Sequence, residues 1–240
     1  MLKSETMNEK DILSLLEENK NERGIKHWND KFAERSGLKS FGLGITALRK
    51  LAKKVGRDHE LAKKLWKSDV YDAKMMSILI DDPKQITREQ AEIQVNDMNQ
   101  PYLAHVFSSC DAPLAKTSFV KELSVDWMSS DSNIKKSCGY GLLYEISKSK
   151  KKDAPDDDFF LHWIEHIRSN FQKEHLSVQG SMGGALLGIG KRNLVLNQAT
   201  LKLAKELGPI HFETEGEYCE PMDLVKHMTS DYLKEKLGIS

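Results

Sequence analysis

One short pattern in the sequence has the residue types and spacing of a metal-binding motif. His162, Glu165 and His166 follow the order H-x-x-E-H, which on a helix places two imidazoles one turn apart. A zinc hydrolase would use the histidines as ligands and the glutamate as a general base. The motif supplies no third ligand, and Phe160 and Trp163 belong to an ordinary apolar stripe. We therefore interpret the segment as a structural helix and expect no bound metal.

Cysteines and glycines give no further catalytic pattern. Cys110, Cys138 and Cys219 lie far apart without a C-x-x-C spacing, which excludes a disulfide framework and favours reduced, buried thiols. The glycines of Gly42-Leu43-Gly44 precede a predicted helix, but no strand leads into them and no Gly-Lys-Ser/Thr follows. A phosphate-binding P-loop is therefore excluded, and we expect no cofactor.

Basic residues are concentrated in two stretches, although 36 basic and 36 acidic residues give the chain a formal net charge of zero. Between Arg49 and Lys67, eight Lys or Arg and two acids leave a local net charge of +6. The second stretch places four lysines in Lys148–Lys152 before four aspartates in Asp153–Asp158. Solvated surface explains both most simply, whereas a phosphate-binding face remains the alternative for the first stretch. On that stretch the residues that share one helical face are Lys50, Lys53, Lys54 and Arg57.

Amphipathic helices must position these residues, because most of the chain repeats the apolar spacing of helices between caps and breaks. Glycines predict two helix ends, at Gly37 and Gly56. Later apolar stretches predict helices over 134–146, 160–167, 182–189 and 196–207. The residues predicted to cap or open helices are Thr46, Asp58, Thr87 with Gln90, Pro101, Pro113 and Asp131.

The series of short helix pairs predicts an all-α fold of about twelve helices. Each pair is too small to bury its own apolar face, so stacking should form a HEAT-like solenoid with a concave binding side. We expect one domain over residues 1–240, in which residues 209–240 form an acidic segment with a capping helix near Leu224. The chain lacks an apolar run long enough to span a membrane and reads as cytoplasmic.

Three stretches together resemble the DNA alkylation repair (AlkD-like) family of HEAT-like DNA glycosylases. They are ALRKLAKKVGRDHELAKKLWKSDVYDAKMMSILIDDPKQIT at Ala47–Thr87, CGYGLLYEISKS at Cys138–Ser149 and GGALLGIGKRN at Gly183–Asn193. The resemblance implies a solenoid that holds duplex DNA by its backbone. In active members, two tryptophans and an aspartate support excision of cationic alkylated purines by stabilising positive charge on the sugar.

The resemblance also predicts that this excision site is altered. The position of the first tryptophan falls on Pro101, that of the aspartate on His105 and that of the second tryptophan on Gly184. An imidazole supplies little counter-charge to a cationic transition state, so excision by the family's route is not expected. Candidate substitutes near these positions are Tyr102, Asp111 and Trp127, each of which also fits an ordinary structural role.

Contacts to the DNA backbone require only cations of the protein, so DNA binding does not depend on the excision site. The resemblance places family contacts near Lys135 and Lys136, and Lys191 with Arg192 ends a helix beside Gly184. Lys150, in the second lysine-rich stretch, completes the set of candidate contacts. Helix-terminal or solvated roles are equally open for these side chains. Glycines 183, 184, 188 and 190 indicate close helix packing, with room for an approaching backbone as the alternative.

The leading hypothesis is therefore that the protein binds double-stranded DNA without efficient excision. In one version of this hypothesis, the DNA is damaged or distorted. An active glycosylase with a rebuilt site, using His105 or Asp111, is the second. A scaffold that binds another protein is the third, modestly favoured by the acidic C-terminal segment and the zero net charge.

Overall fold

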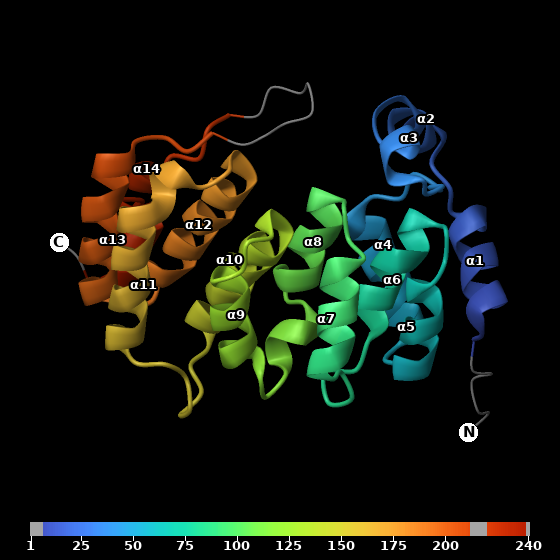
Figure 1. Cartoon of the computed structure of the whole chain (residues 1–240), viewed down its shortest axis with the longest axis horizontal. Coiled ribbons are helices and arrows are strands. Elements are labelled where there is room, and N and C mark those ends of the chain that lie inside the picture. The colour runs from blue at the N-terminus through green and yellow to red at the C-terminus, as the bar shows by residue number, and fades with distance from the viewer. Residues whose placement is uncertain (1–6, 212–219, 239–240) are drawn as a thin grey trace. The chain divides into compact units, whose positions relative to one another are not determined.

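The chain forms two compact helical units in a computed structural model that describes residues 7–211 and 220–238 (Figure 1). Unit 1 comprises Met1–Phe107 with Ala112–Thr117, and unit 2 comprises Ser108–Asp111 with Ser118–Ser240. The expected single domain concerns how the two units join, and it stays a prediction.

Unit 1 is built on α4, α5 and α6, whose apolar faces bury Leu48, Leu65 and Met76 completely. α6 packs against both α4 and α5, and α1 contacts α5 and α6. The elements of this part of the chain are α1 (Glu9–Glu18), α2 (Glu22–Lys31), α3 (Ala33–Ser36), α4 (Ile45–Val55), α5 (His59–Trp66), α6 (Tyr71–Ile80), α7 (Arg88–Asn96), α8 (Pro101–Ser108) and the 3₁₀ helix η1 (Pro113–Lys116).

Unit 2 is organised around α10, which packs against α9 on one side and α12 on the other. Its core includes Phe160, Ile167, Leu186 and Leu203, all with 0% exposure. The elements are α9 (Val120–Met128), α10 (Asn133–Lys148), α11 (Asp157–Asn170), the 3₁₀ helix η2 (Phe171–Lys173), α12 (Leu176–Ile189), α13 (Leu194–Leu207), α14 (Leu224–Met228) and α15 (Asp231–Leu237).

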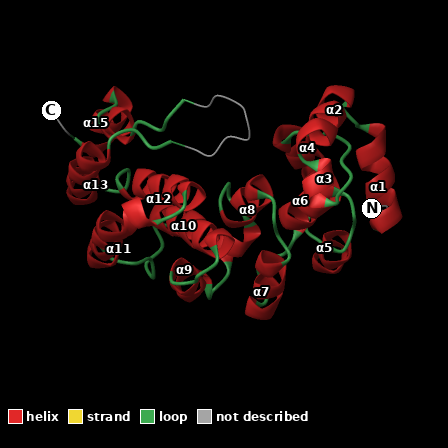
Figure 2. Cartoon of the chain, turned by 45° about the horizontal axis from the view of Figure 1, so that its top comes forward, coloured by secondary structure: helices red, strands yellow, loops and turns green. Residues whose placement is uncertain are grey.

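The described residues contain helices and no β-strand, which confirms the all-α prediction (Figure 2). Two isolated bridges join Lys39 to Val70 and Ile210 to Met222. None of the helices in the described ranges has the length and apolar character needed to cross a membrane. Of the predicted acidic segment, Glu213, Glu215 and Glu217 lie outside the described residues.

Two predicted helix starts were wrong by one or two residues. α4 follows Gly44 rather than Thr46, and Ser132 rather than Asp131 accepts the N-terminal hydrogen bond of α10. Asp58 and Thr87 cap as predicted. The side-chain amide of Gln90, expected to complete the Thr87 capping box, donates instead to Asp81.

Other helices differ more from the prediction, because apolar spacing does not indicate where they begin or how long they are. Pro113 opens only a four-residue 3₁₀ helix, and α12 begins at Leu176, well before the predicted residue 182. The described residues contain fifteen α-helices against about twelve predicted. The pattern did not predict the short α3 and α15, because four and seven residues contain too few turns for a periodic signal.

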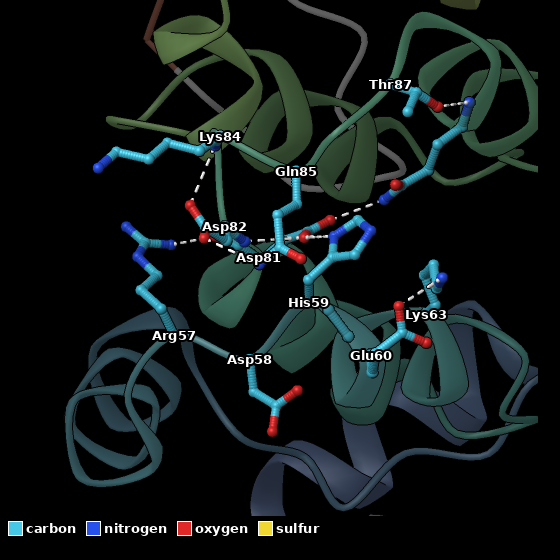
Figure 3. Close-up of polar contacts among 12 residues, drawn as sticks. Arg57, Asp58, His59, Glu60, Lys63, Asp81, Asp82, Lys84, Gln85 and Thr87 are labelled. Atoms are coloured by element: carbon cyan, nitrogen blue, oxygen red, sulfur yellow. Dashed lines mark hydrogen bonds and ion pairs between the residues drawn. The ribbon is translucent and has the colours of Figure 1, made fainter.

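A buried polar cluster joins α5, α6 and α7 within unit 1 (Figure 3). His59 Nδ1 lies 2.7 Å from one carboxylate oxygen of Asp81, and Gln90 donates to the other oxygen at 2.7 Å. Burial raises the pKa of Asp81, and the hydrogen bonds from His59 and Gln90 oppose that shift. Arg57, predicted to share a helical face with Lys50, Lys53 and Lys54, lies instead in the loop after the end of α4. It donates to the carbonyls of Leu79 and Asp81, which joins the α4–α5 loop to the end of α6.

Glycines inside α10 and α12 divide into packed and open positions. A Cβ atom at Gly139 would lie 2.7 Å from the backbone nitrogen of Met128 and 2.9 Å from the carbonyl oxygen of Ser124. A Cβ atom at Gly183 would lie 2.7 Å from Ile210 Cδ1, whereas at Gly184 it would have no heavy atom within 4 Å. Gly183 therefore packs against Ile210, which follows the end of α13, and Gly184 faces open space. Close helix packing explains Gly188, where a Cβ atom would lie 2.7 Å from Tyr144 Cδ2 on α10.

This difference predicts opposite effects for two otherwise matched substitutions. Gly139→Ala should destabilise the protein by about 1–3 kcal/mol, because backbone atoms of α9 must move to admit the methyl group. Gly184→Ala should stabilise it by up to about 1 kcal/mol, because alanine favours the helix and meets no obstacle. Urea denaturation of both variants measures the difference, and equal stabilisation by both substitutions would contradict the packing described for α9 and α10.

Candidate nucleic-acid interface

Unit 2 contains a pocket of about 580 Å³ whose charged lining is mostly basic. The end of α10, the spacer after it, the turn between α12 and α13, and α15 all contribute to its wall. We call it the basic pocket. Its charged lining residues are Lys148, Lys150, Lys191, Arg192 and Lys236, opposed by Asp157. Three of the five residues predicted to contact DNA thus meet in one place.

Arg192 fixes the geometry of this pocket. Its guanidinium donates to the carbonyls of Ser147 and Ser149 at 2.9 and 2.6 Å, and to the carbonyl of Pro155 at 3.2 Å. The same group lies 4.9 Å from the ring centroid of Phe160 on α11. A planar guanidinium suits this arrangement because its donors point in fixed directions while its face stacks on an aromatic ring. Arg192 therefore holds the segments that form the wall of the pocket together. Most of the hydrogen-bonding capacity of its guanidinium is used by carbonyls of the protein.

Lys148 is also paired within the protein. Its ammonium lies 2.7 Å from Glu145 and 3.1 Å from Asp111. Burial lowers the pKa of Lys148, but hydrogen bonds and charge attraction from both carboxylates prevail and raise that pKa overall. Asp111, predicted as a substitute catalytic acid, forms an ion pair with Lys148. It is an exposed residue with a positive φ of 62°.

The remaining three lysines of the basic pocket lack an acidic partner among the described residues. Lys236 donates to the backbone carbonyl of Lys191 at 3.0 Å, which places two ammonium groups in the same part of the pocket. Burial, together with repulsion from Lys236, lowers the pKa of Lys191. Lys150 is exposed. An anion bound here would relieve the repulsion between the two cations.

The other predicted DNA contacts lie at the opposite end of α10. Lys136 donates to both carboxylate oxygens of Glu174 at 2.8 Å, and this ion pair is mostly buried. Lys135 is partly buried beside it. Lys148 follows Lys135 by thirteen positions of α-helix, a span of about 20 Å. The ion pair gives Lys136 a structural role, and contact with DNA stays a prediction for both lysines.

The predicted catalytic positions of α8 lie in unit 1. Pro101 opens the helix, and Tyr102 and His105 are exposed one turn apart, with ring centroids 6.1 Å apart. Tyr102 retains 49% exposure. These residues supply an aromatic ring and an imidazole at the surface. Gly184 and the third substitute, Trp127, lie in unit 2, where Trp127 is only 1% exposed and belongs to the core.

The H-x-x-E-H motif lies on α11, where its side chains contact neighbouring residues of the same helix. Trp163 is buried, and the rings of His162 and His166 pack against its edge or face at centroid distances of 5.4 and 4.9 Å. Glu165 pairs with Arg168 at 3.0 Å. Burial and the neighbouring His162 lower the pKa of His166. Within residues 7–211 and 220–238, no group of His, Cys, Asp and Glu has a metal-binding arrangement.

Lys236 is the pocket residue that sequence reasoning missed. It lies on the short helix α15, 45 residues after Lys191 and outside the three stretches that carry the family resemblance. The one local signal was the sequence of Asp231–Leu237, where Leu233 marks an inward position and two lysines follow it. That signal indicates a short surface helix, but it does not indicate which surface the helix covers.

Comparisons with known proteins agree with this architecture. A family model described as DNA alkylation repair enzyme matches residues 12–207. Uncharacterised proteins of Listeria monocytogenes and Listeria innocua are 26% and 24% identical over 201 and 199 residues, or 80% of this chain and 83% of each relative.

One solved structure matches almost the whole chain. It has a TM-score of 0.80 at 19% identity, and the match covers 98% of this chain and 97% of that one. Its description is "a new family of proteins related to the HEAT-like repeat DNA glycosylases with affinity for branched DNA structures". The similarity confirms the HEAT-like fold.

The contacts of Arg192 predict that its removal damages the protein itself. Arg192→Ala should lower the free energy of unfolding by more than about 2 kcal/mol, because three carbonyls lose a charged donor. Lys150→Ala, in the same pocket, should change stability by no more than about 0.5 kcal/mol. Arg192→Lys keeps the charge but cannot span the three carbonyls, so it should resemble the alanine variant. Urea denaturation tests this order, and an unperturbed Arg192→Ala protein would contradict it.

Proposed function

Because the chain belongs to the DNA alkylation repair enzyme family, we propose that it binds DNA through the phosphate backbone and uses the basic pocket as one contact. The observation that carries this proposal is the grouping of Lys150, Lys191 and Lys236 around one pocket. Backbone contacts of this kind require positive potential and tolerate varied sequence, because every nucleotide offers the same phosphate.

The structural relative supports this choice of ligand. That protein is described as having affinity for branched DNA, and it shares the fold over nearly all of this chain. A chain with zero net charge cannot attract DNA over its whole surface, so binding must depend on locally concentrated cations. The basic pocket provides such a concentration within unit 2.

We further propose that the family's excision site is degraded. The resemblance puts Pro101, His105 and Gly184 where active members carry two tryptophans and an aspartate. Removing a preorganised electrostatic partner typically costs about a hundredfold to a thousandfold in rate. Asp111, the nearest candidate acid in the sequence, already pairs with Lys148. The open space at Gly184 agrees with the loss of a large aromatic side chain from that position.

A salt titration tests the binding proposal. Affinity for a fluorescent duplex should fall steeply as salt rises, because cations of the protein replace condensed counterions. The double variant Lys150→Glu with Lys191→Glu should bind more weakly and reduce the slope of log K against log salt by about two. Lys205→Glu, near the far end of α13 and about 18 Å from the pocket, is the matched control. Unchanged binding by the double variant would exclude the pocket as a contact.

An excision assay tests the second part. Incubation with methylated duplex DNA should release no alkylated base beyond the spontaneous rate, because the site lacks the family's acid and tryptophans. Released bases are measured by chromatography, with an active family member as the positive control. Fast release that disappears in His105→Ala or Asp111→Ala would show instead that the chain is a glycosylase with a rebuilt site.

A further inference from the structure

The C-terminal helix α15 is fastened to the turn that carries Lys191. Leu233 anchors the helix with 1% exposure, and Lys236 donates to the Lys191 carbonyl at 3.0 Å. The preceding helix α14 is held to the same turn, because the side chain of Asn197 donates to the carbonyls of Gly190 and Met228 at 3.0 and 3.3 Å. The exposed face of α15 therefore has a fixed position beside the basic pocket.

That face carries an aromatic ring one helical turn before Lys236. Tyr232 is 73% exposed and lies four residues before Lys236, so the two side chains share one face of the helix. Two further exposed apolar residues, Leu194 and Val195, follow the pocket residue Asn193 at the start of α13. Exposed aromatic rings interleaved with cations are typical of surfaces that hold single-stranded nucleic acid.

The pocket is also larger than a contact to one duplex phosphate requires. Its volume of about 580 Å³ lies within the range of small-molecule sites, which take whole ligands rather than single groups. The repulsion between Lys191 and Lys236 favours occupation by an anion. Asn193, whose side chain donates to both carboxylate oxygens of Asp157 at 2.9 Å, keeps the one acidic lining residue engaged.

We propose that the basic pocket and Tyr232 together bind an unpaired nucleotide of DNA, with its phosphate among Lys150, Lys191 and Lys236 and its base stacked on Tyr232. Bases inside a duplex stack on their neighbours, so only terminal, flipped or single-stranded bases can offer a face to the tyrosine. The inference rests on the proposed function and narrows its ligand to DNA that combines duplex with single-stranded nucleotides. It also assigns a role to a helix that lies beyond the family match at residue 207.

The test compares a blunt duplex with the same duplex carrying a short single-stranded tail at either end. The wild-type chain should bind one tailed form more tightly, and Tyr232→Ala should lose that advantage, about tenfold in affinity, while its binding to the blunt duplex is unchanged. Tyr232→Phe keeps the ring and should behave like wild type. A 2-aminopurine base in the tail should lose fluorescence on binding wild type but not Tyr232→Ala, which reports stacking directly.

Leu176→Ala is the matched control, because Leu176 is 46% exposed and starts α12 at the end opposite the pocket. Equal affinity of wild type and Tyr232→Ala for every tailed duplex would overturn this inference and leave salt-dependent duplex binding intact. Absence of salt-dependent binding to any DNA would overturn the proposed function itself. A loss of affinity in Leu176→Ala as large as in Tyr232→Ala would also overturn the inference, since the effect would not belong to the pocket.

Discussion

The arrangement of unit 2 around its pocket depends on the hydrogen bonds of one guanidinium. The last carbonyls of a helix have no partner within it, and they form the negative end of its dipole. Arg192 supplies charged donors to one such carbonyl of α10, at Ser147, and to two carbonyls of the spacer that follows. The spacer, the end of α10 and the α12–α13 turn are thereby held together, and the lysines on them acquire fixed relative positions.

Cations in unit 2 thus divide into those paired with acids of the protein and those with no acidic partner among the described residues. Lys136 pairs with Glu174, and Lys148 pairs with Glu145 and Asp111. The Lys136–Glu174 pair is mostly buried, so it costs desolvation and contributes mainly to defining the geometry. Lys150, Lys191 and Lys236 have no such acidic partner among the described residues, so their field extends into the pocket. A net charge of zero for the whole chain therefore says little about the potential at this place.

Local signals in the sequence predicted the helices well, because caps and apolar spacing act over a few residues. Asp58, Thr87, Gly37 and Gly56 mark the helix ends where they were expected. The basic pocket was predicted less completely, because its wall is formed by segments that lie far apart in the sequence. Lys191, Arg192 and Lys150 could be singled out by their place in the resemblance or in a lysine-rich stretch. Only the fold shows that Lys236 joins them and that Arg192 and Lys136 are occupied internally.

Binding and excision place different demands on a protein, so the proposed loss of excision is compatible with the proposed binding. Phosphate binding depends on a field that several lysines share, so the loss or displacement of one cation weakens it gradually. Excision depends on a carboxylate and aromatic faces held in one preorganised geometry around the sugar. Replacement of an aspartate by His105 and of a tryptophan by Gly184 would abolish that geometry without altering the basic pocket. The pocket residues Lys191 and Lys236 lie on other elements, the α12–α13 turn and α15, and those elements are held by their own hydrogen bonds.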